Sequence, residues 1–363
     1  MLNKLSKGIY ICLGLILLNN LVQAQGVVST PRPSPASTVT QTVGISTVTV
    51  NYSRPAVQGR EIWGALVPYG WNKQQGLGPA NDAPWRAGAN ENTVISFSNP
   101  VKVEGHEVPA GSYGLFFVIN KDNTGEVVLS KDYKSWGSFF YDPASDELRA
   151  KIDLRDIPQT EWLTYDFINL SPNSAVLVLN WEKKQFPVKI EYATNQLVVA
   201  NAKQQLTNMQ GFTWMGFSSA ANYCAQNKVE LDQGLKWADN AVAMNSNFQS
   251  NAARCNVLKA MGRQDEADKA LKSACEVGKE NELNNYGYAM IANKDYKTAI
   301  EVLTINTQKF PKSANVWDSL GEAYALSGDK QNAIANFKKS LSMNPPANVK
   351  ANSEKYLKQL GAM

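Results

Sequence analysis

Two stretches near the carboxyl end of the chain carry the same residue types at positions 34 apart. The later copy has its characteristic residues at Trp317, Leu320, Gly321, Tyr324, Ala333, Phe337 and Pro345. The earlier copy has Leu283, Tyr286, Gly287, Met290, Ala299, Leu303 and Pro311. Gly, Ala and Pro recur, and the other positions stay apolar. One helix hairpin cannot bury its apolar face alone, so a repeat of this length predicts hairpins stacked into an α-solenoid.

The spacing of these residues resembles the tetratricopeptide repeat, in which small residues let paired helices approach closely and Pro ends the second helix. Weaker copies place Gly234 and Ala267 where Ala299 and Ala333 stand later. The four positions are separated by 33, 32 and 34 residues, which indicates about four hairpins. Residues 347–360 have an amphipathic pattern and are expected to form a capping helix. We therefore expect a tetratricopeptide-like solenoid over 195–363.

The half that precedes the repeats has the alternation of strands. Val48, Val50 and Tyr52 alternate with polar residues, and several later segments rich in Val, Ile, Thr and aromatic residues do the same. Trp162 and Trp181 lie within such segments and are expected in the core. Many short strands without intervening helices predict an all-β antiparallel sandwich or barrel-like domain over 28–193. The chain is thus expected to be multidomain.

The first 24 residues have the pattern of a secretory signal peptide. Lys4 and Lys7 precede an apolar run of about ten residues, and small residues lead up to Ala24. The run is shorter than the roughly 20 residues of a spanning helix, so an uncleaved anchor is the weaker alternative. We expect cleavage after Ala24, a periplasmic or secreted protein, and no transmembrane segment after cleavage.

Charge and composition exclude several classes of function. The formal net charge is +4, and losing Lys4 and Lys7 with the leader gives 4 − 2 = +2, which argues against nucleic acid as a partner. The single histidine, His106, excludes multi-histidine metal sites, and we expect no metal and no cofactor.

Three cysteines remain after loss of the leader. In an oxidising compartment they suggest one disulfide, and the positions of Cys224 and Cys255 along neighbouring helices favour that pair over Cys255 with Cys275. Three buried free thiols are the alternative.

The amino-terminal half also contains several uncommon strings. They are PRPSPAS at 31–37, VNYSRPAVQGREIWGALVPYG at 50–70, WRAGANENT at 85–93, PAGSYGLF at 109–116 and SWGSFFYD at 135–142. Together they resemble a secreted bacterial domain family of unknown function, some of whose members carry carboxyl-terminal tetratricopeptide repeats. The resemblance implies an all-β domain exported in a Gram-negative cell, and it supplies no catalytic residue.

Polar and aromatic residues in these strings are candidates for a ligand pocket. An arginine fork and an aromatic face would suit a carboxylate, a phosphate or a sugar, and Glu91 would add an acceptor. The candidate residues are Arg54, Arg60, Trp85, Arg86, Asn90, Glu91 and Trp136. The alternative is a structural Arg–Glu pair that ties loops to the sheet.

The repeat template also predicts which residues face a concave groove. These are Asn281, Asn284 and Tyr288 in the third hairpin, and Asn315, Asp318 and Glu322 in the fourth. A clamp for a peptide carboxylate would need Lys and Asn there, so it is disfavoured. A neutral-to-acidic groove fits a basic or polar peptide, unless it is empty or filled by the chain's own β domain.

These patterns favour an exported, non-catalytic binding scaffold. The repeats would bind a protein or peptide, and the β domain would bind a small molecule, a glycan or a partner. The alternative is a cell-envelope enzyme whose β domain acts on a carbohydrate or another envelope polymer through Arg86 and Glu91. No convincing catalytic constellation is present in the sequence.

Overall fold

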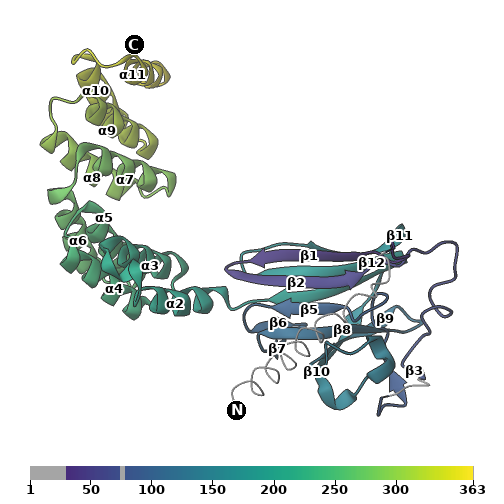
Figure 1. Ribbon diagram of the computed structural model, residues 1–363. Helices are drawn as coiled ribbons and strands as arrows, with labels where there is room; N and C mark the ends of the chain where they lie inside the picture. Colours follow the sequence, from purple (N-terminus) through teal and green to yellow (C-terminus); the bar gives the residue numbers. More distant parts are fainter. Residues whose placement is uncertain (1–29, 74–77, 363) are drawn as a thin grey trace, which may run out of the picture. The chain divides into compact units, whose positions relative to one another are not determined.

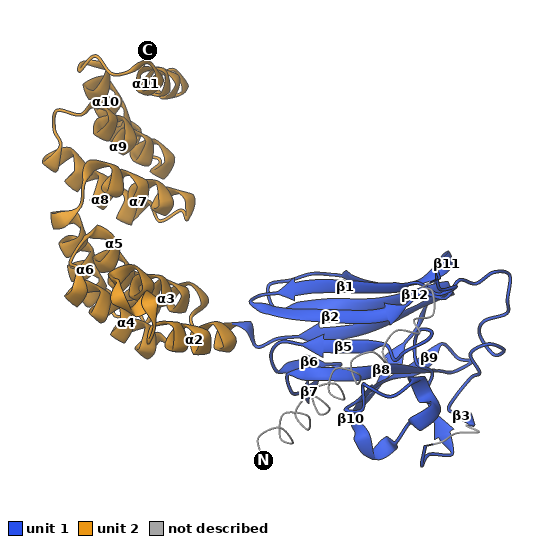
Figure 2. Cartoon of the chain, in the orientation of Figure 1, with its two compact units in different colours: residues 1–194 blue, residues 195–363 orange. Residues whose placement is uncertain are grey.

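The computed structural model describes residues 30–73 and 78–362, which form two compact units, residues 1–194 and 195–363 (Figure 2). The predicted signal peptide, 1–24, lies outside the described residues.

The first unit is built from antiparallel sheets, as the alternating segments predict (Figure 1). A six-stranded sheet has the order β1 (Ala36–Val43), β2 (Ser46–Ser53), β5 (Val94–Phe97), β8 (Gly111–Ile119), β9 (Thr124–Ser130) and β10 (Asp146–Asp153). A four-stranded sheet has the order β11 (Arg155–Ile168), β12 (Ser174–Glu191), β6 (Val101–Val103) and β7 (His106–Val108). A small third sheet pairs β3 (Asn72–Lys73) with β4 (Asp82–Ala83), and two short turns of helix, η1 (Gly137–Phe140) and η2 (Pro143–Ser145), precede β10.

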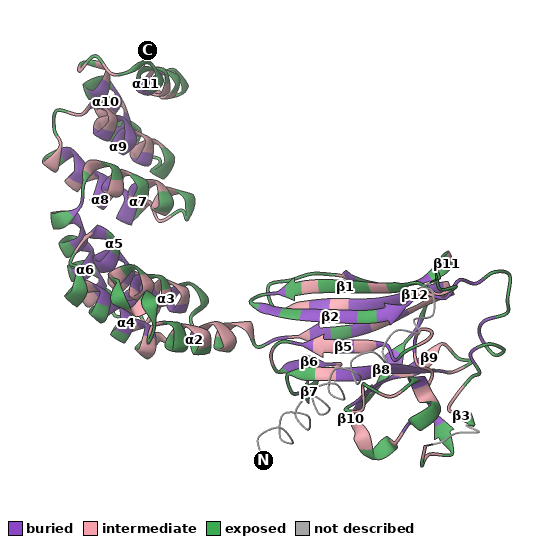
Figure 3. Cartoon of the chain, in the orientation of Figure 1, coloured by how far each residue is buried: buried purple, intermediate pink, exposed green. Residues whose placement is uncertain are grey.

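The core of this unit follows from side-chain alternation along the strands (Figure 3). In β2 the side chains of Val48, Val50 and Tyr52 are buried and those between them face outward. Trp181 is fully buried, as predicted, whereas the prediction for Trp162 is wrong because its neighbour Leu163 takes the inward position. The register of β11 against β12 shifts on either side of Thr160, so the face occupied by each residue could not be counted from the sequence.

The second unit is helical. Its elements are α2 (Thr194–Gln205), η3 (Met209–Phe212), α3 (Trp214–Asn227), α4 (Leu231–Met244), α5 (Phe248–Ala260), α6 (Gln264–Val277), α7 (Glu280–Ala292), α8 (Tyr296–Lys309), α9 (Ala314–Ser327), α10 (Lys330–Leu341) and α11 (Ala347–Gln359). From α3 to α10 the helices pair as four hairpins, and α11 packs on the last one. In Figure 1, α7, α9 and α11 lie along the inner side of the curved unit, and α8 and α10 lie along its outer side. None of the described helices is both long and apolar enough to cross a bilayer.

Small residues at the repeat positions allow the helices of a hairpin to touch. A Cβ atom on Gly287 would lie 2.6 Å from Leu303, and one on Gly321 would lie 2.9 Å from Phe337. Ala299 and Ala333, on the second helices, are fully buried. The close packing inferred from the repeat is therefore confirmed for these hairpins.

The predicted disulfide between Cys224 and Cys255 is not formed, and both residues, with Cys275, are buried free thiols. The physical reason is the direction of the side chains. Cys224 packs against Gly234 in the apolar cluster that contains Trp237, whereas Cys255 belongs to the next cluster with Cys275. Burial raises the pKa of the Cys255 and Cys275 thiols, to about 11 and about 12 respectively.

The glycine contacts give a first prediction. Gly321→Val should destabilise the helical unit by about 1–3 kcal/mol, because the added side chain must displace the Phe337 ring in a filled seam. Urea unfolding of the full chain, followed by helical circular dichroism, measures the change. Ala289→Val, at an exposed position of α7, is the control and should cost only about 0.5 kcal/mol through helix propensity. Equal losses in the two variants would contradict the close-packing argument.

Candidate functional site

The inner helices of the last two hairpins and α11 place polar side chains in two rows with a 34-residue period. One row contains Asn284, Asp318 and Asn352, and the other contains Tyr288, Glu322 and Tyr356. The period that builds the hairpins therefore also aligns these side chains, and α11 continues it beyond the last complete hairpin. We call Tyr288, Asp318, Glu322, Asn352, Ser353 and Tyr356 the groove network.

Two carboxylates lie at the centre of the groove network. Glu322 accepts hydrogen bonds from Tyr288 Oη at 3.1 Å, Asn352 Nδ2 at 3.1 Å and Tyr356 Oη at 3.0 Å. Asp318 accepts from the same Asn352 Nδ2 at 2.9 Å and from Ser353 Oγ. All four donating side chains are neutral. Within the described chain, neither carboxylate forms an ion pair.

Burial raises the pKa values of several groups in the groove network and leaves its carboxylates without a counterion among the described groups. Asp318 is 4% exposed, and burial raises the pKa of its carboxyl group, although hydrogen bonds from Ser353 and Asn352 oppose the shift. Burial and the nearby Glu322 carboxylate raise the pKa of Tyr356 to about 12 and also raise that of Tyr288, so both phenols stay protonated as donors. Lys355 Nζ lies over the Tyr356 ring 5.3 Å from its centroid, and it forms no ion pair with Asp318 or Glu322 among the described residues. The negative charge of the groove network thus lacks a paired cation.

The structure brings together only some of the predicted groove residues. Tyr288, Asp318 and Glu322 meet in the network. Asn284 lies in the same row as Asp318, with a buried side-chain oxygen that has no partner among the described atoms. Asn281 is exposed and Asn315 is half-buried, and the structure records no side-chain hydrogen bond for either.

Sequence reasoning missed the contribution of α11. Asn352, Ser353 and Tyr356 were assigned only to a cap, although adding 34 to 318 and 322 gives 352 and 356. This 34-residue spacing could therefore have predicted that Asn352 and Tyr356 join the two rows.

In the β domain, the candidate Arg86 is occupied by its own surroundings. Its guanidinium donates to the Asn90 carbonyl and lies over the Phe139 ring at 5.4 Å from the centroid. Gly137 has a φ of +60°, and a Cβ there would lie 2.5 Å from Arg86 Cζ, so only glycine leaves room for the guanidinium. Arg86 therefore ties its loop to the segment around η1.

Arg86 and Glu91, which the pocket hypothesis places together, form no ion pair with each other among the described residues. Glu91 accepts instead from Arg32 at 2.6 Å, and both of these side chains are about half exposed. The Arg32 hydrogen bond is the main cause that lowers the pKa of the Glu91 carboxyl group. Arg86 and Glu91 thus have separate partners.

The remaining candidates also make contacts within the domain. Arg54 donates to the Leu163 carbonyl at 2.9 Å, and Arg60 donates to the carbonyls of Ala56 and Val57. Trp85 and Asn90 also contact the domain itself. Trp85 stacks on Trp181 with ring centroids 5.7 Å apart, and Asn90 donates to the Ser34 carbonyl at 3.1 Å. Arg54 and Arg60 thus hold their surroundings through carbonyl groups rather than through the Arg–Glu pair of the structural alternative.

Trp136 is the exposed one of the two tryptophan candidates. Its side chain is 50% exposed, and it stands beside two other exposed aromatic residues of the same segment, Phe139 at 47% and Phe140 at 42%. Three large exposed rings thus lie within five residues, one of them beneath the Arg86 guanidinium, and we call these three residues the η1 patch. Such patches mark interaction sites more often than isolated exposed rings do.

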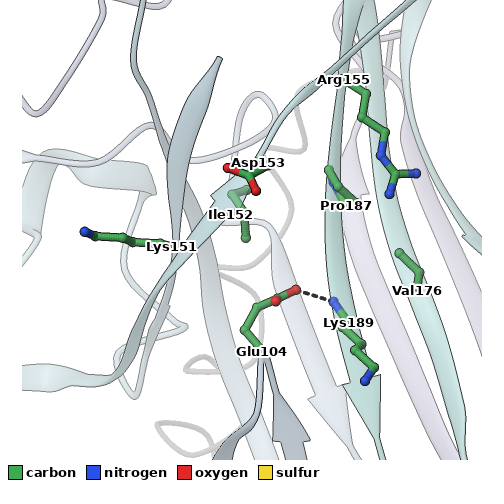
Figure 4. Close-up of a pocket in the computed structure, with 8 residues that line it drawn as sticks. All are labelled: Glu104, Lys151, Ile152, Asp153, Arg155, Val176, Pro187 and Lys189. Atoms are coloured by element: carbon green, nitrogen blue, oxygen red, sulfur yellow. Dashed lines mark hydrogen bonds between the residues drawn. The ribbon is translucent and has the colours of Figure 1, made fainter. Parts of the chain in front are cut away.

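A depression of about 380 Å³ lies where β10 approaches the four-stranded sheet (Figure 4). It is lined by Glu104, Lys151, Ile152, Asp153, Arg155, Val176, Pro187 and Lys189, and none of these was predicted as a site residue. Glu104 accepts from the Lys189 backbone N–H, the Lys189 ammonium pairs with Glu191 at 2.9 Å, and Lys151 points away from the other charges in Figure 4. The depression therefore holds dispersed charges of both signs rather than a convergent group.

No cluster of three or more His, Cys, Asp or Glu residues suited to a metal ion is found in the part of the chain that the structure describes.

Comparison with known families supports the two-part organisation. The model of a family described as a protein of unknown function (DUF2911) matches residues 34–190, and that of the tetratricopeptide repeat matches residues 314–346. No curated protein matches the chain.

Three solved structures illustrate what the chain is similar to. The first, described as a functional characterisation of Pseudomonas aeruginosa pilF, is 20% identical, with 42% of this chain and 71% of that chain covered and a TM-score of 0.27. MamA is 15% identical, with 44% and 91% covered and a TM-score of 0.28. YrrB, titled a TPR protein with an unusual peptide-binding site, is 17% identical, with 44% and 83% covered and a TM-score of 0.25.

The contacts of Arg86 predict a structural effect of its removal. Arg86→Ala should lower the stability of the β domain by about 1–3 kcal/mol, because a charged donor to a carbonyl is lost. Arg32→Ala, which breaks only a half-exposed ion pair, should cost less than about 1 kcal/mol. Thermal unfolding followed by tryptophan fluorescence compares them, and an Arg86→Ala protein as stable as the wild type would contradict this role.

The buried carboxyl group of Asp318 predicts a pH dependence. Since its folded pKa lies above the ordinary value near 3.8, the folded state binds the proton more tightly, and wild-type stability falls as pH rises through the interval between the two. Asp318→Asn removes this fall, so its stability relative to wild type should increase from about pH 4 to about pH 7. Urea unfolding at each pH measures the difference.

Asp329 provides a control with the opposite sign. Hydrogen bonds from Asn332 lower the pKa of the Asp329 carboxyl group, so its contribution is present above the ordinary pKa and lost as pH falls. Asp329→Asn should therefore lose stability relative to wild type over the same rise in pH. A parallel trend in the two variants would argue against the burial effect at Asp318.

Proposed function

We propose that this chain, a DUF2911 domain followed by tetratricopeptide repeats, is an exported binding scaffold whose helical unit holds a basic segment of a partner protein. The tetratricopeptide match gives the helical unit the architecture of a protein-interaction scaffold. The proposal adds three statements to this architecture: the partner is basic, the β domain binds a ligand, and the protein is exported.

The single observation that carries the proposal is the state of the two groove carboxylates. Asp318 and Glu322 are held by neutral donors alone, and Asp318 is buried although its charge is unpaired. A buried charge without a counterion lowers the stability of the folded chain. A lysine or arginine side chain of a partner would pair with this charge, and the free energy of that ion pair would favour binding. The rows run across three helices, which suits an extended segment lying along them.

The β domain contributes a second surface in this proposal. The η1 patch offers three exposed aromatic rings, and rings of this kind pack on the apolar faces of sugars or on apolar side chains. We assign the unidentified ligand of the β domain to this patch. The contacts of Arg86 with Asn90 and of Glu91 with Arg32 give no support to the alternative of an envelope-polymer enzyme.

The leader pattern of residues 1–24 supports export, and a periplasmic or secreted location is part of the proposal. Detection of a mature amino terminus at Gln25 in the periplasmic fraction would test it.

Binding of a peptide array tests the groove. The mature protein should select peptides rich in Lys and Arg, and Glu322→Gln should weaken binding of a selected peptide about 10-fold or more, because an ion pair in a partly buried site is lost. Fluorescence anisotropy with the labelled peptide gives the Kd of each variant, and added salt should weaken wild-type binding.

Glu301→Gln is the matched control for that experiment. Glu301 is exposed on the outer helix α8, so the variant has the same charge change away from the groove network and should bind like the wild type. Selection of acidic peptides, or equal weakening by the two variants, would refute the proposed recognition.

A further inference from the structure

The two main sheets of the β domain have four edges, and three of them carry features that oppose pairing with another strand. The edge strand β10 has charged residues at five of its eight positions and a register shift after Asp146. The edge strand β11 contains Pro158 and two register shifts. The edge strand β7 has three residues, and its Glu107 pairs with Lys102. Charges, proline, bulges and short length are the usual protections of sheet edges.

The fourth edge, β1, has none of these protections. It is eight residues long, without charge or proline, and its register with β2 runs without interruption from Ala36 to Val43. Every second residue of such a strand turns its backbone N–H and C=O away from its neighbour. Among the described residues, only the Gln41 side chain, donating to the Thr42 carbonyl at 2.8 Å, adds a hydrogen bond to the β1 backbone beyond those with β2.

The lack of charge extends over the whole hairpin. Residues 36–53 contain no Asp, Glu, Lys or Arg, in a chain that is 19% charged. Pairing of this hairpin with an identical hairpin therefore opposes no like charges. The absence of charge therefore favours a second copy of the chain as the strand that pairs with β1.

The outward face of the hairpin gives a second argument for the same occupant. Thr40 lies opposite Thr49, with the hydroxyls 3.0 Å apart, and the row continues through Ser96 to Ser112, whose hydroxyls are 2.8 Å apart. Threonine pairs across strands are favourable. In an antiparallel pairing of β1 with β1 of another copy, threonines at alternate positions, Thr38, Thr40 and Thr42, would meet threonines and lengthen this row.

We propose that β1, the edge strand of the six-stranded sheet in Figure 1, is a self-association edge through which two copies of the chain join these sheets into one continuous sheet. The proposal is independent of the groove network and of the nature of any partner bound there. It predicts a two-fold symmetric dimer in which each β1 is hydrogen-bonded to the other.

Sedimentation of the mature full chain over a range of concentrations tests the proposal. Wild type should form a dimer, and the double variant Thr38→Lys with Thr40→Lys should weaken dimerisation by on the order of 10-fold or more, because it brings like charges together across the new pair. Both side chains are exposed, and the variant also loses the hydrogen bonds of Thr38 with Asn51 and of Thr40 with Thr49, so a small fall in the melting temperature is expected. A wild-type chain that stays monomeric up to its solubility limit would overturn the proposal.

Two controls separate this edge from other surfaces. Thr47→Lys with Asn51→Lys places the same charge on the same face one strand further from the edge, and it should leave the dimer intact. Phe212→Ser removes an exposed apolar side chain on η3 in the helical unit, so it tests association through that unit, and it should also leave the dimer intact. A dimer abolished by Phe212→Ser but not by the β1 lysines would assign association to the helical unit and refute the role of β1.

Discussion

The close contact between the two helices of each repeat is the constraint on which the helical unit depends. At Gly287 and Gly321 there is no room for a Cβ atom, so the first helix of each of these hairpins lies directly on the second. Repetition of that contact every 34 residues fixes the rotation of each inner helix. The same rotation places Tyr288 beside Glu322, so packing in the seam and alignment of these two side chains have one cause in the last two hairpins.

This common cause explains how much could be predicted from the sequence. The all-β half, the solenoid and three members of the groove network follow from periodicity, because a residue's face is set by its position in a regular element. The contacts of Arg54 and Arg86 did not follow, since they depend on which carbonyls the loops bring near: Arg54 reaches a carbonyl 109 residues away. Cys224 and Cys255 were compared by height along their helices, whereas the direction of each side chain decided the outcome.

The two units differ in how their charged side chains are paired. In the β domain, Arg54, Arg60 and Arg86 donate to backbone carbonyls, which ties loops to their surroundings. The helical unit keeps Asp318 buried and Glu322 beside it without a cation, an arrangement that costs stability in the isolated chain. Sites that sacrifice stability in this manner commonly do so for binding. In the proposed function, this contrast places the electrostatic specificity of the protein in its repeats.

The final helix has a consequence for how such a chain could change length. Because α11 keeps the repeat register, Asn352 and Tyr356 stand one period beyond Asp318 and Glu322, and the Tyr356 ring stacks on Phe337 of the hairpin before it. Excision or duplication of one 34-residue module would present the terminal helix with an equivalent neighbour. The groove is therefore extensible in whole modules, and gene rearrangement could tune its reach without redesigning its end.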